Sequence, residues 1–185
     1  MWRWGISSKA ALVALALAVA AAAPASSKVF LTLDEALELA FPGCEVERST
    51  VYLTPVQLDG ARRLAGVPVD QRIVRPYVAT CNGTPAGVAY FDAHRVRTLP
   101  ETLMVVVDPR GRVKRIEVLS FQEPEGYLPR GIWYEQFLSQ GLTDELNLKR
   151  DIRGVTGATL TARATTEAVR RVLALHRILQ EKDPP

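Results

Sequence analysis

The sequence Val155-Thr156-Gly157-Ala158-Thr159-Leu160-Thr161 stands directly before the longest helical pattern in the chain. From Ala164 onward, apolar residues recur with the spacing of one buried helix face, which predicts a helix over 161–179. Small residues in the quoted stretch let the backbone turn tightly, and the first amides of a helix have no partner inside it. The stretch therefore predicts a turn whose free amides suit an anion, most naturally a phosphate.

The same residues also fit an ordinary helix start. The side chains of Thr156, Thr159 and Thr161 can each accept a hydrogen bond from a backbone amide, as N-cap residues do. A single Gly-Ala turn is weak evidence for a ligand, so the spacing alone favours a plain helix cap over a cofactor anchor.

Residues 156–161 closely resemble the Ser/Thr-Gly-Ala-Thr-x-Thr/Ser signature of the FMN-binding domain family. That family includes flavin-carrying components of the sodium-translocating NADH:quinone oxidoreductase and of the Rnf electron-transport complex. In its members a flavin transferase esterifies the flavin phosphate to the threonine that follows Gly-Ala. The resemblance, which extends over about 99–179, therefore implies that Thr159 carries FMN through a phosphodiester. It also implies a surrounding cofactor-binding turn made of Thr156, Gly157, Ala158, Leu160 and Thr161.

A second segment, Glu123-Pro124-Glu125-Gly126, partly resembles the family's Glu-Thr-Pro-Gly loop, which lies beside the flavin. The resemblance implies that Glu123 and Gly126 help to bind the cofactor. Trp133 and Phe137 follow, four residues apart in a short helical stretch. This spacing favours packing in the core over stacking on a flavin.

Three basic residues stand shortly before the turn. Lys149, Arg150 and Arg153 lie near enough in the sequence to neutralise a phosphate, or else they face solvent. Arg153 also occupies a position at which the family usually has an acidic residue, and Ala162 occupies one at which it usually has serine.

Local signals predict two helices in the first third of the chain. The capping-box pattern that begins at Thr32 predicts a helix that ends before Pro42. Thr54 followed by proline predicts the start of a second helix, which ends at Gly66. Both helices serve packing.

Strand-like runs fill the middle of the chain and predict an antiparallel sheet. The runs are 46–53, 72–81, 86–91, 103–107 and 113–121. The turn at Asn82-Gly83 and the turn over 108–111 join the last four runs into two hairpins. The predicted order αβαββββα gives the α+β class: an antiparallel sheet of four or five strands, packed with several helices, and a long C-terminal helix after the flavin-attachment turn.

The first 25 residues have the pattern of an export signal. A cationic start with Arg3 and Lys9 precedes an apolar run over 10–23, and a small-residue cleavage site stands before Ser26. The apolar run falls short of the ~20 residues that a membrane-spanning helix needs, which favours cleavage. We therefore expect a signal peptide at 1–25, one domain at 26–185, and a periplasmic or other extracytoplasmic location, with membrane association if the segment is retained.

The two cysteines allow one disulfide. Export would place Cys44 and Cys81 in an oxidising compartment, and two buried thiols are the equally weighted alternative. No Cys-x-x-Cys pair is present, which disfavours thioredoxin-like chemistry and c-type haem.

No other motif predicts catalysis or metal binding. His94 and His176 are isolated from carboxylates and cysteines at ligand spacing, and His176 falls on the apolar helix face, where packing is favoured. The nucleophile, P-loop and dinucleotide-binding fingerprints are absent. The formal net charge is +3, and two of the positive charges lie in the predicted signal, so nucleic acid is not an expected partner.

The resemblance implies a flavin-bearing electron carrier, a redox component without catalytic residues of its own rather than a stand-alone enzyme. Its expected partners are a flavin transferase and electron-transfer proteins of the membrane or periplasm. The alternative is a flavin-free exported interaction module, in which the Thr-Gly-Ala-Thr turn only caps a helix.

Overall fold

A computed structural model describes residues 28–181 of the 185-residue chain. The described part has an α+β fold, as the sequence predicts, with a six-stranded antiparallel sheet and a long C-terminal helix. The predicted export signal at 1–25 lies outside the described residues. Between residues 28 and 181, no helix is both long enough and apolar enough to cross a membrane.

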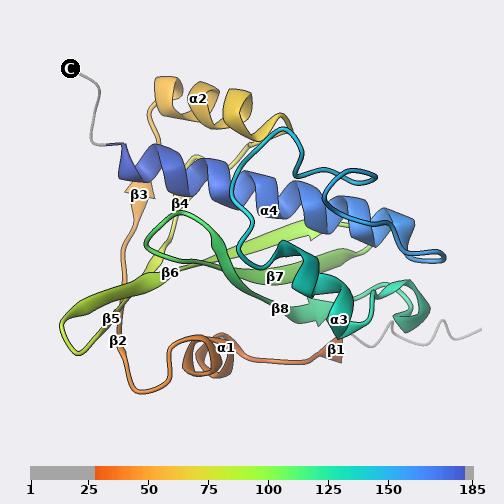
Figure 1. Ribbon diagram of the computed structural model, residues 1–185, viewed down its shortest axis with the longest axis horizontal. Helices are drawn as coiled ribbons and strands as arrows, with labels where there is room; N and C mark the ends of the chain where they lie inside the picture. Colours follow the sequence, from red (N-terminus) through yellow and green to blue (C-terminus); the bar gives the residue numbers. More distant parts are fainter. Residues whose placement is uncertain (1–27, 182–185) are drawn as a thin grey trace, which may run out of the picture.

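Most of the strands lie in the middle of the sequence, between the N-terminal helices and the long C-terminal helix (Figure 1). In chain order they are β1 (Lys28–Val29), α1 (Leu33–Ala40), β2 (Glu45–Arg48), β3 (Val51–Tyr52), α2 (Pro55–Ala65), β4 (Ile73–Val74), β5 (Tyr77–Cys81), β6 (Thr84–Arg95), β7 (Pro100–Val107), β8 (Val113–Phe121), the 3₁₀ turn η1 (Glu125–Tyr127), α3 (Gly131–Tyr134), the 3₁₀ turn η2 (Glu135–Phe137) and α4 (Thr159–Gln180). The main sheet has the order β1-β8-β7-β6-β5-β2, and β3 pairs with β4 in a separate small sheet.

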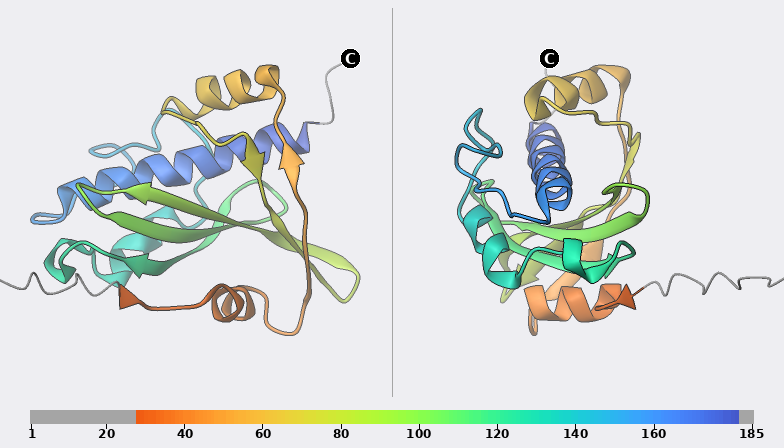
Figure 2. Two further views of the ribbon diagram at one scale, coloured as in Figure 1. Left: turned by 180° about the vertical axis from the view of Figure 1, so that it is seen from behind. Right: turned by 90° about the vertical axis from the view of Figure 1, so that its right-hand side faces the viewer.

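Helices cover both faces of the curled main sheet. Helix α4 lies along one face with α2 packed outside it, and α1 covers the other face (Figure 2). From Leu103 to Val107, strand β7 is apolar without interruption because it contributes to both cores. Val105 and Val107 belong to the core beneath α4, whereas Met104 and Val106 belong to the core beneath α1, and all four are fully buried.

The predicted helix starts are confirmed in detail. Thr32 and Glu35 form a reciprocal capping box at α1, and Thr54 and Gln57 form another at α2. Helix α2 ends at Gly66, whose φ of 63° is in the left-handed region that glycine adopts without strain.

Both predicted hairpins are present. Asn82 and Gly83 have φ angles of 51° and 74°, as a two-residue turn between twisted strands requires. In the second hairpin, the Asp108 carboxylate accepts hydrogen bonds from the amides of Arg110 and Arg112, both at 2.9 Å. The conformations that Asn82 and Gly83 tolerate and the hydrogen bonds of Asp108 are local properties of these residues. The sequence therefore predicts both turns.

The prediction of one continuous strand over 46–53 is wrong. The chain bends after β2, where the amide of Ser49 donates to the carbonyl of Pro76 at 3.0 Å, so that β3 leaves the main sheet. The run 72–81 is likewise divided into β4 and β5, because Pro76 between them has no N–H for the ladder. With these breaks and three strands of only two residues, the described part contains eight strands instead of four or five.

The predicted disulfide is confirmed. Cys44 and Cys81 are bonded, with their Cα atoms 4.5 Å apart, which rules out the alternative of two free thiols. Cys44 precedes β2 and Cys81 ends β5, so the bond fastens the segment after α1 to the adjacent hairpin.

A buried arginine joins α4 to α2 and to the loop before α4. Arg170 is 5% exposed, and its guanidinium donates to three backbone carbonyls. They are those of Ala65 at 2.6 Å, Thr143 at 2.7 Å and Leu146 at 3.0 Å. Because Ala65 is the last residue of α2, this contact also satisfies one of the free carbonyls at that helix end.

Replacing Arg170 with methionine is expected to lower the free energy of unfolding by about 2 to 3 kcal/mol. Methionine keeps much of the apolar stem but leaves buried carbonyls without donors, and each such loss costs about 1 kcal/mol or more. Urea unfolding measures the change. Arg163→Met, at an exposed position of the same helix, is the matched control, with an expected change within about 0.5 kcal/mol. Equal stability of the two variants would contradict the assignment.

Candidate functional site

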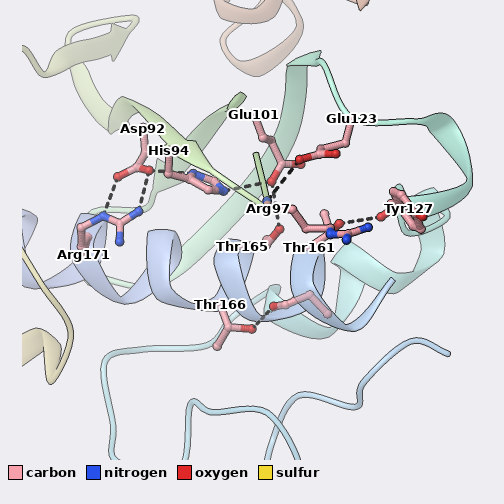
Figure 3. A network of polar contacts seen from close by, with 11 residues as sticks. Asp92, His94, Arg97, Glu101, Glu123, Tyr127, Thr161, Thr165, Thr166 and Arg171 are labelled. Atoms are coloured by element: carbon pink, nitrogen blue, oxygen red, sulfur yellow. Dashed lines mark hydrogen bonds and ion pairs between the residues drawn. The ribbon is translucent and has the colours of Figure 1, made fainter. Parts of the chain in front are cut away.

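Three segments meet at the N-terminus of α4. They are the first turn of α4, the turn over 96–99 between β6 and β7, and η1 after β8 (Figure 3). The hydroxyl of Thr161 donates to the carbonyl of Tyr127 at 2.6 Å and thereby joins α4 to η1. The segments border a hollow of about 170 Å³, lined by Val96, Arg97, Tyr127, Gly157, Ala158, Thr159, Leu160 and Thr161.

The start of α4 has no side-chain cap. Its N-cap residue is Ala158, which has no side-chain acceptor, and none of the three nearby threonines takes that role. Gly157 has a φ of 84°, so the turn before the helix needs glycine. Among the described residues, no acceptor is found for the amides of Thr159, Leu160 or Thr161. Alanine is a poor N-cap, so the interpretation of this turn as a plain helix cap has lost its main support.

The three threonines have different environments. Thr161 is fully buried and its hydroxyl is bonded to Tyr127, which makes it inaccessible to a modifying enzyme. Thr156 is exposed but does not line the hollow. Thr159 is exposed and lines the hollow, and its hydroxyl donates only to the carbonyl of Val155, at 3.2 Å. Thr159 is therefore the one of the three whose hydroxyl can be reached at the hollow.

Glu123 is close to the site but its carboxylate supports the neighbouring turn. Its Oε1 atom accepts the amides of Thr98 and Leu99, at 2.7 and 2.8 Å, and that of Arg97 at 3.3 Å. The Thr98 hydroxyl donates to the same atom at 3.2 Å. The backbone bonds from Leu99 and Thr98 hold the pKa of this carboxyl below its ordinary value. Gly126 is exposed within η1 and does not line the hollow.

The basic residue at the hollow is one that the sequence did not indicate. Lys149, Arg150 and Arg153 are exposed and line no part of it. Arg150 pairs with Glu145 at 2.6 Å instead. Arg97 supplies the positive charge, and it lies far from the Thr-Gly-Ala-Thr turn in sequence, so only the β6–β7 hairpin brings it there.

Comparison with known families covers most of the segments that form this site. Residues 99–174 match the FMN-binding domain family, close to the span of 99–179 expected from the resemblance. This part of the chain is an FMN-binding domain. Its cofactor is therefore FMN. No curated protein and no solved structure matches the chain.

The hollow of the FMN-binding domain fits the phosphate end of the cofactor. Free amides at the start of α4 and the Arg97 guanidinium supply donors for phosphate oxygens. A volume of about 170 Å³ is smaller than the ~300 to 1,000 Å³ of pockets that enclose a drug-sized ligand. The hollow therefore suits the phosphate, and the isoalloxazine ring must find its contacts beyond it.

A buried ionic network fastens β6 and β7 to α4 (Figure 3). Arg171 binds both carboxylate oxygens of Asp92, at 2.8 and 3.0 Å. The ring of His94 lies between two carboxylates, with Nδ1 2.9 Å from Asp92 and Nε2 3.0 Å from Glu101. Thr165, one helical turn beyond Thr161, donates to Glu101 at 3.4 Å, so the network ends close to the hollow.

The prediction that His94 is isolated from carboxylates is wrong. Both ring nitrogens face carboxylate oxygens, so both donate and the ring is the imidazolium. Burial disfavours that charge, but the bonds and charges of Asp92 and Glu101 outweigh it and raise the pKa of His94 to about 9. Burial likewise opposes ionisation of Asp92, yet His94 and Arg171 lower its pKa to about 2. Asp92 and His94 are two apart on a strand, and that period-two spacing is the signal that could have paired them.

The other sequence-based assignments concern packing of the core. His176 is buried and its Nδ1 atom lies 2.9 Å from the Tyr90 hydroxyl, which confirms a packed histidine. Trp133 and Phe137 are buried in the core and stack edge to face, as predicted. The described residues contain no cluster of potential ligands for a metal ion.

Proposed function

We propose that this protein is an exported flavoprotein that carries FMN covalently on Thr159 and relays electrons between redox partners. The observation that carries the proposal is the start of α4 within the FMN-binding domain. There, the exposed residue Thr159 lines a hollow together with Arg97 and with residues at the start of α4 whose amides have no acceptor among the described residues. When bound, FMN supplies the redox chemistry, and the protein supplies its position and electrostatic surroundings.

The size of the hollow favours a covalent bond. A site that accommodates little more than the phosphate end has too little apolar surface to retain FMN against dilution outside a cell. In the attachment step, the Oγ1 atom of Thr159 loses its proton and bonds to the flavin phosphorus. The leaving group of the flavin donor departs with the electron pair of the P–O bond that breaks. The hydroxyl's bond to Val155 is lost, at a cost of about 1 kcal/mol.

The start of α4 also stabilises the product. A phosphodiester keeps one negative charge, and the positive end of a helix dipole stabilises an exposed anion by about 0.3 to 1 kcal/mol. This small stabilisation is sufficient, because the covalent bond retains the flavin and the helix only needs to orient its phosphate.

The proposed location rests on the N-terminal pattern and on the disulfide. The signal-like segment at 1–25 directs export, and a Cys44–Cys81 bridge persists in an oxidising compartment. The partners are then a flavin transferase for maturation and electron-transfer proteins of the membrane or periplasm. The alternative of a flavin-free interaction module leaves the uncapped start of α4 without a role and does not account for the match to the FMN-binding domain family.

Replacing Thr159 with alanine is expected to abolish covalent flavin. The wild-type chain and variants are expressed with and without a flavin transferase, denatured, and separated on a gel, and the flavin fluorescence of each band is recorded. The wild-type band is fluorescent only with the transferase, Thr159→Ala is dark, and Thr156→Ala is as bright as wild type. Fluorescence in Thr159→Ala would overturn the attachment point. A dark wild-type band beside active transferase would favour the flavin-free module.

A further inference from the structure

We propose that Arg97 binds the phosphate of FMN and that Glu123 holds Arg97 in position. The inference rests on the proposed cofactor site at the start of α4 and adds residues outside the segment that carries the Thr-Gly-Ala-Thr signature. It assigns the site a specificity, namely for flavins that carry a phosphate over flavins that do not.

Arg97 has the position and the freedom that this role requires. Arg97 lines the hollow together with Thr159, and its guanidinium lies over the ring of Tyr127, 5.5 Å from the centroid. Between residues 28 and 181, the guanidinium has neither a carboxylate partner nor a hydrogen-bond acceptor. The aromatic face orients the planar group without using its N–H donors, which stay free for phosphate oxygens.

The other nearby cations are less suited to the role. Arg95, on the same hairpin, donates to the carbonyl of Thr98 at 3.1 Å. Lys28 pairs with Glu125. Arg153 is exposed away from the hollow, with its amide bonded to Gln136 at 2.9 Å. Arg97 is therefore the free cation that opens on the hollow in the described part of the chain.

Glu123 makes the turn that carries Arg97 rigid. One carboxylate oxygen accepts three successive amides, from Arg97 to Leu99, and the hydroxyl of Thr98. Glu123 is 7% exposed and lies between β8 and η1, so it ties the arginine's backbone to the segment that contains Tyr127. Glu123 is a positioning residue in this account, and it does not touch the cofactor.

The arrangement predicts recognition of a phosphate ester. Arg97 contributes a charge and a fork of donors, and the amides of Leu160 and Thr161, which line the same hollow, contribute further donors. Riboflavin has the same ring and ribityl chain but no phosphate. It therefore gains nothing from this pair of contacts.

The test is an NMR titration of the folded chain, expressed without transferase, with FMN and separately with riboflavin. The amide resonances of Leu160 and Thr161 report on the phosphate, and the rest of the spectrum reports on the fold. FMN is expected to shift these amides, and riboflavin is not. In Arg97→Gln the Kd for FMN rises by about ten-fold, as expected for the loss of one charge-assisted contact. Arg97→Lys recovers part of the affinity, and Arg153→Gln, the matched control, binds as wild type.

The positioning role has its own readout. Glu123→Gln keeps an acceptor for the turn amides and is expected to bind FMN within about two-fold of wild type, whereas Glu123→Ala weakens FMN to the level of Arg97→Gln. The double variant with Arg97→Gln and Glu123→Ala is then no weaker than Arg97→Gln alone, because the two residues act through one contact.

Several outcomes would overturn the inference. They are unmoved amides in the wild type at millimolar FMN, equal affinity of wild type and Arg97→Gln, or riboflavin shifting the same amides. Whether Thr159 is flavinylated is measured independently, by the fluorescence of denatured bands. A fluorescent wild type with an unaffected Arg97→Gln titration therefore refutes this inference alone, and a dark wild type refutes the attachment alone.

Discussion

Replacing Asp92 with alanine is expected to lower the free energy of unfolding by about 3 to 5 kcal/mol. Asp92 is 1% exposed and accepts hydrogen bonds from both Arg171 and His94. Its removal leaves Arg171 without a carboxylate partner and leaves His94 with Glu101 alone to offset its loss of hydration. Urea unfolding near pH 6 measures the effect, and Glu145→Ala, which removes an exposed ion pair with Arg150, is the matched control. The control is expected to cost no more than about 1 kcal/mol.

The same network gives the wild-type protein a defined pH dependence. The folded-state pKa of His94 is raised from 6.5 to about 9, so its contribution is complete below about pH 6.5 and is lost as the pH rises through about 9. The pKa of Asp92 is lowered from 3.8 to about 2, so its contribution is present above about pH 4 and is lost as the pH falls through about 2. The loss of stability on the alkaline side is expected to be much smaller in His94→Gln. A wild-type stability that does not change between pH 6 and 9.5, or Asp92→Ala as stable as Glu145→Ala, would contradict this account.

Removing the disulfide is expected to lower the free energy of unfolding by about 4 kcal/mol. The bridge closes a loop with a sequence separation of 37, and the chain-entropy model gives that value for a loop of this length. The loop contains α2 and joins β2 to the β5–β6 hairpin, so its closure restricts a large part of the unfolded chain. The measurement is urea unfolding of the Cys44→Ala, Cys81→Ala double variant against wild type.

A reductant provides the control for the disulfide. Dithiothreitol is expected to shift the wild-type transition to the position of the double variant and to leave the double variant unchanged. A wild-type transition that is insensitive to reductant under unfolding conditions would mean that the bridge contributes little or is not formed.

The elements that could be predicted from sequence are those specified by local interactions. The second helix begins after an N-cap threonine with proline at its first position, and the Asn82-Gly83 hairpin requires two positive φ angles that these residues tolerate. The break before Tyr77 has a local signal, Pro76, which the prediction of one run over 72–81 did not take into account. The break after Arg48 was not predicted, because it depends on which sheet each short strand joins. Tertiary packing decides which sheet a strand joins, and the β-propensity of single residues does not predict it.

The candidate site was predictable only where one segment carries its signal. The turn at 156–161 has a signature of its own, so Thr159 could be named from the sequence. Arg97 and the partners of His94 reach the site through strand pairing between β6 and β7 and through their packing on α4. Glu123 was predicted from the resemblance of its segment to the family's Glu-Thr-Pro-Gly loop, and it does lie close to the hollow. Its hydrogen bonds, however, show that it supports the turn between β6 and β7.

The most direct test of the central claim is the mass of the tryptic peptide 154–163, which spans the turn, from protein coexpressed with a flavin transferase. The expected result is a peptide heavier by FMN less one water, with fragment ions that locate the added mass on Thr159. An unmodified peptide, or an added mass located on Thr156 or Thr161, would contradict it.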